Sequence, residues 1–297
     1  MLSCRVSAGG ARSQGKGVRT LLSFVKFEHT LFALPFAYTG MLLAERGWPG
    51  LTVFFWITIA MIGARTASMA LNRVVDAELD ARNPRTADRE IPRGALTRRD
   101  GLLLALVGFA LFIWAGWALN PLTLALLPVA VLFLSVYPYL KRFTWLCHLW
   151  LGVTIGAAAA GGWIAVTGEF APGATLLWLA VALWIQGFDI IYALLDSDFD
   201  RRHRLKSVPA RFGADVARRL AMLSHLAAWI AFVLAGAATG SGWVYAAGVV
   251  AVGAVLVFEH YLVASRGAAA ALTSFNVNLY VGAIMLVATA LDVALVT

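Results

Sequence analysis

Two short stretches of the chain place aspartates at spacings that would let several carboxylates act together. Asn72, Asp76 and Asp80 recur at every fourth residue, and a second acidic group occupies residues 189–200. Side chains four residues apart share one face of a helix. Carboxylates that face one another repel, so a cation has to lie between them. Mg²⁺ prefers oxygen ligands and completes its coordination with substrate phosphates. The spacing therefore predicts a magnesium site that binds a diphosphate.

The second acidic group indicates which of its members face that site. At about 100° per residue, Asp189, Asp196 and Asp200 fall within one sector of a helix, and Asp198 points to the other side. We therefore expect Asp196 and Asp200 to act as metal ligands together with the aspartates of the first group. Asp198 should face solvent or a basic neighbour. The other acids near the first group should balance arginines in an ordinary charged loop; they are Glu78, Asp88, Glu90 and Asp100.

Membrane-spanning helices must position these groups. Of the 297 residues, 61% are hydrophobic and 13% are charged, which is about half the charged fraction of a soluble domain. A helix needs about 20 apolar residues to cross a bilayer. Nine stretches have about that length: residues 24–43, 51–71, 101–119, 122–140, 146–166, 174–195, 220–238, 244–262 and 275–297. The predicted fold class is all-α, a polytopic membrane bundle of nine transmembrane helices, with the acidic groups at the ends of the second and the sixth.

The basic residues indicate how this bundle is oriented. Residues 72–100 and 196–219 each contain seven Lys or Arg, whereas the loops of the other side contain Arg46 alone. Because basic loops stay in the cytoplasm, we expect an integral membrane protein with both charged loops, the acidic groups and the N-terminus on the cytoplasmic side. The net charge of +8 is then a topology signal and does not indicate a nucleic acid partner. Residues 1–20 should form a flexible basic cytoplasmic tail and residues 21–297 a single transmembrane domain.

Both acidic groups, with their flanks, resemble the signatures of the UbiA-type intramembrane prenyltransferases. The first signature is NRVVDAELD at residues 72–80, which continues as NPRTADREIPRG at residues 83–94. The second is YALLDSDFD at residues 192–200, followed by KSVPARFG at residues 206–213. Between them, YPYLKR at residues 137–142 matches a further element of the family. The resemblance covers nearly the whole chain, including the number of spans.

This resemblance implies a fold and an activity. Nine helices would surround a central cavity, and Asp76, Asp80, Asp196 and Asp200 would bind Mg²⁺ and the diphosphate. VKFEHTLFALPFAY at residues 25–38 is similar to the 4-hydroxybenzoate polyprenyltransferase-like branch. That branch implies transfer of a polyprenyl group from polyprenyl diphosphate to the ring of an aromatic acid, with release of diphosphate, in ubiquinone or menaquinone biosynthesis. An acceptor of the futalosine route to menaquinone, 1,4-dihydroxy-6-naphthoate, remains an alternative.

The same resemblance assigns roles to several basic and amide side chains. Asn72 would be an oxygen ligand of the metal or would contact the diphosphate. Arg65, two turns earlier on the same helix face, would contact the diphosphate or the acceptor carboxylate, or would pair with a structural acid. Lys141 would contact the diphosphate. Three weaker candidates for substrate contacts have anchoring at the membrane interface as their alternative role: Arg142 and Lys206 for the diphosphate, and Lys26 for the acceptor carboxylate.

Three residues are candidates for the chemical step. Asp189 lies deeper in its helix than the metal pair, and it could accept a proton from the acceptor or form a buried structural hydrogen bond. Tyr137 and Tyr192 could shield the allylic cation through their ring faces. The small residues at 156–162 either let helices approach closely or leave space for the prenyl chain, and close packing is the expectation.

A secondary transporter is the rival from another class, because intramembrane acids and nine spans would also suit one. Transport sites usually lie near the middle of the bilayer, however, and these acids lie at one face beside arginine-rich loops. We therefore prefer a site for an anionic headgroup. The expected partners are polyprenyl diphosphate, an aromatic acid acceptor and the lipid bilayer. The sequence determines neither the oligomeric state nor the length of the prenyl chain.

Overall fold

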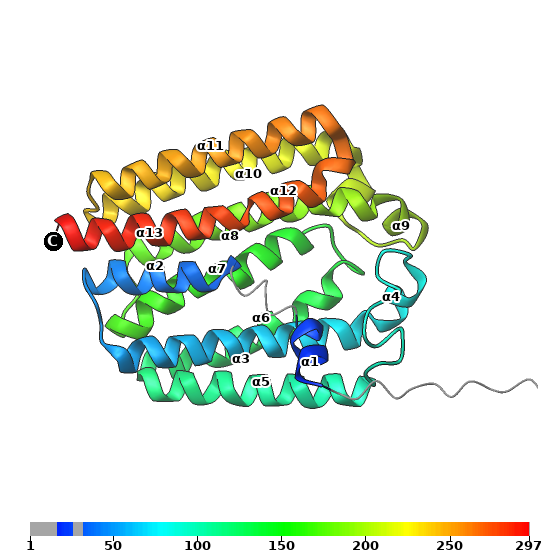
Figure 1. Cartoon of the computed structure of the whole chain (residues 1–297), viewed down its shortest axis with the longest axis horizontal. Coiled ribbons are helices and arrows are strands. Elements are labelled where there is room, and N and C mark those ends of the chain that lie inside the picture. Colours follow the sequence, from blue (N-terminus) through cyan, green and yellow to red (C-terminus); the bar gives the residue numbers. More distant parts are fainter. Residues whose placement is uncertain (1–16, 26–31, 297) are drawn as a thin grey trace, which may run out of the picture.

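Long helices that lie side by side build the described part of the chain (Figure 1). The computed structural model describes residues 17–25 and 32–296, which contain helices and turns but no β-strand. Residues 1–16 of the predicted tail lie outside the described residues, and the first helix begins inside that tail, at Val18. The helices are α1 (Val18–Phe24), α2 (Leu34–Glu45), α3 (Leu51–Val75), α4 (Ala77–Arg82), α5 (Arg98–Leu119), α6 (Pro121–Leu140), α7 (Cys147–Thr167), α8 (Pro172–Tyr192), η2 (Ala193–Asp196), α9 (Ser197–Arg202), α10 (Val208–Thr239), α11 (Trp243–Arg266), η3 (Gly267–Ala270), α12 (Ala271–Val277) and α13 (Leu279–Val296).

The nine predicted spans all correspond to helical segments of the described residues. Within those residues, seven stretches are long and apolar enough to cross a membrane. One of them, Trp243–Leu295, contains two passes, because the chain turns back at Gly267 (φ 60°) between α11 and α12. α2 has 12 residues, fewer than the roughly 20 of a complete span. The protein is an integral membrane protein, as its composition predicts.

The last predicted span is divided in the structure. Residues 275–297 were expected to form one helix, but α12 ends and α13 begins around Asn278. The amide of Asn278 donates to Ser274 O (3.0 Å), and its Oδ1 accepts from Trp184 Nε1 (2.7 Å). A side chain that bonds to the nearby backbone competes with the helix. Apolar length alone does not reveal such a break.

Glycines bring α7 into close contact with two neighbouring helices. A Cβ atom at Gly156 would lie 2.8 Å from Ala182 N of α8, and one at Gly162 would lie 1.9 Å from Ala37 O of α2. Neither position has room for a side chain. The close packing predicted for this run of small residues is therefore confirmed at these two positions.

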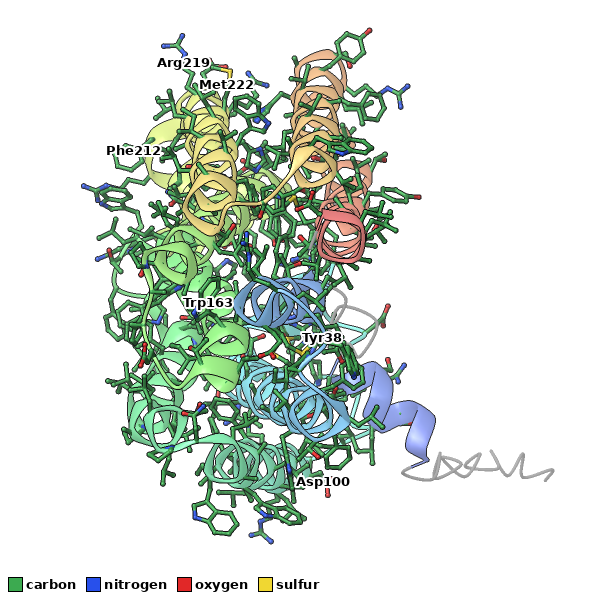
Figure 2. All side chains as sticks on the ribbon, turned by 90° about the vertical axis from the view of Figure 1, so that its left-hand side faces the viewer. Tyr38, Asp100, Trp163, Phe212, Arg219 and Met222 are labelled. Atoms are coloured by element: carbon green, nitrogen blue, oxygen red, sulfur yellow. The ribbon has the colours of Figure 1, made fainter. Side chains whose placement is uncertain are left out.

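Apolar side chains fill the interior of the bundle and also cover its outside. Trp184 of α8 and Phe232 of α10 are fully buried in the largest interior cluster. Phe212 and Met222, by contrast, are 41% and 51% exposed. Figure 2, which views the bundle from one end, shows these two at its edge and Trp163 within it. On a chain with seven helical stretches that could cross a membrane, such exposed apolar side chains fit a lipid environment.

Candidate active site

A cavity of about 800 Å³ lies between α3, α6, α7 and α8. Its polar end is lined by Asn72, Arg85, Arg89, Asp189 and Tyr192. Most of the remaining wall consists of aliphatic and aromatic side chains. A largely apolar cavity with a few convergent polar groups is the usual form of a ligand site. The predicted central cavity is therefore present, and residues of both acidic motifs line its polar end.

A helix break falls at an aspartate in each acidic motif. Asp76 (φ −90°, ψ 3°) separates α3 from α4, and Asp196 (φ −104°, ψ 4°) separates η2 from α9. These dihedral angles lie in a sparsely populated region where many active-site residues are found. The prediction of one continuous helix through residues 189–200 is wrong, because α8 ends at Tyr192 and a 3₁₀ turn follows. Figure 1 shows α4 and α9 at the same end of the bundle.

Asp76 is buried, and basic side chains from the end of α6 surround it. Lys141 Nζ lies 2.7 Å and Arg142 Nη2 lies 2.9 Å from its carboxylate oxygens. Asn72 Nδ2 donates to the same carboxylate at 3.3 Å. Lys141 and Arg142, both expected to contact the diphosphate, therefore lie at Asp76 and pair with its carboxylate.

The second aspartate of each motif is also buried. Both oxygens of Asp80 accept from Arg89 Nη1, at 2.7 and 2.8 Å. Arg89 also lines the cavity. Asp200, the counterpart in the second motif, lies in the first turn of α9. Both carboxylates are therefore shielded from solvent, unlike those of an ordinary charged loop.

Side chains of the loop after α4 join the first motif to the second. Asn83 Nδ2 donates to Asp196 Oδ1 at 3.0 Å, and Arg85 Nε donates to the same oxygen at 2.9 Å. Arg85 Nη1 also donates to Tyr192 Oη at 2.9 Å, with the guanidinium carbon 5.3 Å from the ring centre. Partial burial lowers the pKa of Arg85, but the hydrogen bond to Asp196 and the nearby negative groups outweigh burial and raise it. The two acidic motifs therefore meet in space.

The donor set at this end fits magnesium. Among residues 17–25 and 32–296, no group of three or more His, Cys, Asp or Glu side chains is close enough to hold a metal ion alone. Mg²⁺ does not need such a cage, because it usually binds one or two carboxylates together with water and substrate phosphates. Two pairs of aspartates at adjoining helix ends supply ligands of this type. The neighbouring Lys and Arg side chains are suited to the phosphate oxygens.

Asp189 is held by a histidine that sequence reasoning missed. His148 Nδ1 lies 2.7 Å from Asp189 Oδ2, and His148 Nε2 accepts from Val208 N at 3.2 Å. Because Nε2 is an acceptor, the ring proton belongs on Nδ1 and is donated to Asp189. His148 is buried, whereas Asp189 is 25% exposed and lines the cavity. The sequence offered one signal for His148, namely that it is a lone polar residue at the start of an apolar run.

Arg65 and Tyr137 line the cavity and interact electrostatically. The Tyr137 hydroxyl lies 3.5 Å from Ser68 O. Lys206 is not brought to the aspartates, because its Nζ donates to Phe143 O at 2.9 Å. Lys26, the other weak candidate for a substrate contact, lies outside the described residues.

Two of the acids predicted to lie outside the site pair with arginines. Asp198 is exposed and pairs with Arg201 at 3.0 Å, as predicted. Glu78 pairs with Arg98 at 2.8 Å, and that hydrogen bond lowers the pKa of Glu78.

Glu90 differs from the expectation of a solvated loop residue. It is buried, lines the cavity and accepts from Ser23 Oγ at 2.8 Å. The reason is tertiary, since Phe24 of α1 packs with residues of the same loop, including Leu96. Arg85 and Asn83 were also missed as site residues, although both belong to the quoted signature that follows the first aspartates.

The residues that build this site also match a family. The model of the UbiA prenyltransferase family matches residues 33–287, which include both aspartate motifs and the helices between them. The chain belongs to the UbiA prenyltransferase family. Among its UbiA relatives, the 4-hydroxybenzoate octaprenyltransferase of Aromatoleum aromaticum is 32% identical over 255 residues, 84% of this chain and 85% of that protein. The protein of the same name from Alkalilimnicola ehrlichii is 30% identical over 260 residues, 86% and 87% of the two chains.

Solved UbiA structures have the same fold. The apo UbiA homolog from Aeropyrum pernix K1 has a TM-score of 0.82 and 34% identity, covering 89% of this chain and 98% of that one. The UbiA homolog from Archaeoglobus fulgidus bound to DMAPP and Mg²⁺ has a TM-score of 0.71 at 15% identity, covering 91% and 99%. Family and fold therefore agree that this chain is a membrane-embedded prenyltransferase.

Proposed function

We propose that this protein transfers a polyprenyl group from polyprenyl diphosphate to the ring of an aromatic acid of the 4-hydroxybenzoate type, with Mg²⁺, and releases diphosphate. One observation carries the proposal: two aspartate motifs meet at the charged end of a single, largely apolar cavity. Relatives named 4-hydroxybenzoate octaprenyltransferase support the acceptor class. The homolog bound to DMAPP and Mg²⁺ supports the donor and the metal.

The four aspartates of the two motifs would hold the metal; they are Asp76, Asp80, Asp196 and Asp200. When bound, Mg²⁺ supplies Lewis-acid stabilisation of the departing diphosphate. Asn72, which already contacts Asp76, would orient that carboxylate or donate its own amide oxygen. This assignment is the one that the spacing of the motifs predicts.

Basic side chains at the aspartates would bind the diphosphate. Lys141 and Arg142 pair with Asp76, Arg89 with Asp80 and Arg85 with Asp196. When a metal neutralises the carboxylates, these cations can turn to phosphate oxygens, because charge-assisted hydrogen bonds to phosphate are strong. They would then stabilise the charge that develops as the allylic C–O bond breaks.

The remaining cavity residues would handle the organic part of the reaction. The ring faces of Tyr137 and Tyr192 can stabilise an allylic cation. Asp189 would accept the proton that the acceptor loses. His148 holds the Asp189 carboxylate through Nδ1–H, and its Nε2 is already used by Val208 N–H, so the carboxylate is the base available to the cavity.

Arg65 would bind the acceptor carboxylate, because it lines the cavity, interacts with Tyr137 and lies two helical turns before Asn72 on α3. Lys26 is a second candidate for the same contact. Arginine-rich loops at the aspartate end favour the cytoplasmic side for the site, where a water-soluble aromatic acid and a lipid diphosphate can both reach it.

Purified protein in lipid nanodiscs tests this function. With Mg²⁺ and octaprenyl diphosphate, we expect 4-hydroxybenzoate to cause diphosphate release and to yield a prenylated acid detectable by mass spectrometry. Parallel reactions with 1,4-dihydroxy-6-naphthoate decide between the two acceptors. Absence of acceptor-dependent diphosphate release with both acids would contradict the proposal.

The metal assignment has its own test. Asp76→Asn and Asp196→Asn should each lower kcat roughly a hundredfold or more, as loss of a group that stabilises transition-state charge does. Asp198→Asn is the matched control, since Asp198 belongs to the same motif but is exposed and pairs with Arg201. If the Asp196 variant retains the kcat of the Asp198 variant, the assignment is wrong.

A further inference from the structure

The cavity extends well beyond the aspartates along α6 and α7. On α6, the lining residues Leu127, Ala130, Leu134 and Tyr137 recur at intervals of three or four and so form one helix face. That face runs from the charged end, at Tyr137, most of the way to the first residue of the helix, Pro121. The cavity is therefore elongated parallel to the helices.

A matching face of α7 forms the adjoining wall. Thr154, Ala158, Gly161 and Ala165 line the cavity at intervals of three or four residues. All four are small, so this wall leaves the space open. Leu126 of α6 packs against the neighbouring α7 residues Ala160 and Ile164, which fixes the level at which the two walls meet.

Gly161 differs from the other glycines of α7. A Cβ atom at Gly156 or Gly162 would collide with a neighbouring helix, whereas a Cβ atom at Gly161 would meet nothing within 4 Å. Gly161 is exposed although it lies inside a helix, and the space it faces is the cavity. Packing therefore does not explain the missing side chain at this position.

The position of Gly161 along the helix is informative. Gly161 follows His148, which contacts Asp189 at the polar end, by 13 residues. At 1.5 Å per residue, the two positions are about 20 Å apart along the helix axis. Only a long apolar ligand anchored at the polar end would reach Gly161, and short ones would end before it.

We propose that the prenyl chain of the donor lies along the α6–α7 wall of this cavity and that Gly161 determines how long a chain the enzyme accepts. The inference rests on the proposed function, because it takes the diphosphate end of the chain to lie at the aspartates. It adds a residue that controls specificity and that contacts the chain far from the reacting atoms.

Substitution of Gly161 tests the inference with two donors. Wild type and Gly161→Phe are assayed in nanodiscs with Mg²⁺, the better acceptor, and either geranyl or octaprenyl diphosphate. We expect the variant to lose roughly tenfold or more in kcat/KM with octaprenyl diphosphate, since pocket shape discriminates to that extent. With geranyl diphosphate, kcat/KM should stay within about threefold of wild type.

Two further variants make the result specific. Ala130→Phe narrows the cavity from the α6 wall and should produce the same change in donor preference. Ala125→Phe adds the same ring to an exposed α6 position that does not line the cavity, and it should retain the wild-type preference. Phe at position 161 also removes a helix-destabilising glycine, so the variant is expected to fold.

The ratio of the two kcat/KM values decides the outcome. An unchanged ratio in Gly161→Phe, or an equal loss with both donors, overturns the inference. A change in Ala130→Phe alone would place the control of chain length on α6 and also overturn it. Wild-type protein that transfers neither prenyl group would instead contradict the proposed function, so the two failures are distinguishable.

Discussion

Three carboxylates at the site are paired with groups from other segments of the chain. Asp76 pairs with residues that follow α6, Asp196 with the loop after α4, and Asp189 with the start of α7. Such partners hold charged side chains in place, since a buried charge without a partner is costly. They also keep basic groups at the point where a diphosphate would arrive.

The contact between His148 and Asp189 predicts a specific kinetic defect. His148→Ala removes the donor that fixes the Asp189 carboxylate, so kcat should fall by about a hundredfold, the lower range for loss of general base catalysis. KM for octaprenyl diphosphate should change little. Separate measurement of kcat and KM checks this.

His148→Gln serves as the comparison, because a glutamine amide can donate to Asp189 in place of Nδ1–H. This variant should recover a substantial part of kcat. Equal kcat in the Ala and Gln variants would show that His148 acts only through packing.

At the scale of the elements, two features shape the site. The breaks at Asp76 and Asp196 end the long helices and direct the short helices α4 and α9. Glycines of α7 then set how near α2 and α8 approach, which leaves the cavity on the remaining face of α7. The small residues at 156–162 therefore allow close helix packing on one side of α7 and leave the cavity open on another.

This division predicts different effects of leucine at two positions of α7. Gly156→Leu forces a side chain against the α8 backbone at Ala182 and should destabilise the protein by about 1–3 kcal/mol or more, as overpacking does. Gly161→Leu points into open space and should leave stability unchanged or slightly higher. Thermal unfolding in one detergent compares the two, and equal unfolding temperatures would contradict the assignment.

At the scale of the whole molecule, the site joins two distant parts of the chain. The first motif lies at residues 72–80 and the second at residues 189–200, and Asn83 and Arg85 connect them. A ligand that binds both motifs would hold these parts together, and a ligand that binds only the folded state stabilises it.

We therefore expect Mg²⁺ and inorganic diphosphate together to raise the thermal unfolding temperature by several degrees. Mg²⁺ alone or diphosphate alone should have a smaller effect. When one of the two is missing, the carboxylates and the basic groups of the site still neutralise one another. Excess EDTA should abolish the shift, and Asp196→Asn should show none. A full shift in the Asp196 variant would place the binding site elsewhere.

Much of this protein was determined by the sequence alone, because the relevant signals are local. Apolar length predicted the helices, and four-residue spacing singled out the aspartates. The orientation that the basic loops indicate stays a prediction. The interruptions at Asp196 and Asn278 were not predicted. Asp196 bonds to Asn83 and Asn278 bonds to Trp184, and contacts with such distant residues do not show in the pattern along one helix.

Only the tertiary structure decided which groups meet. It paired Arg85 with Asp196, placed His148 against Asp189, buried Glu90 under α1 and separated Gly161 from the closely packed glycines. These outcomes depend on contacts between residues far apart in the chain, and periodicity along one helix carries no information about the neighbouring helix. The residue types thus determined the chemistry available, and helix packing determined its arrangement.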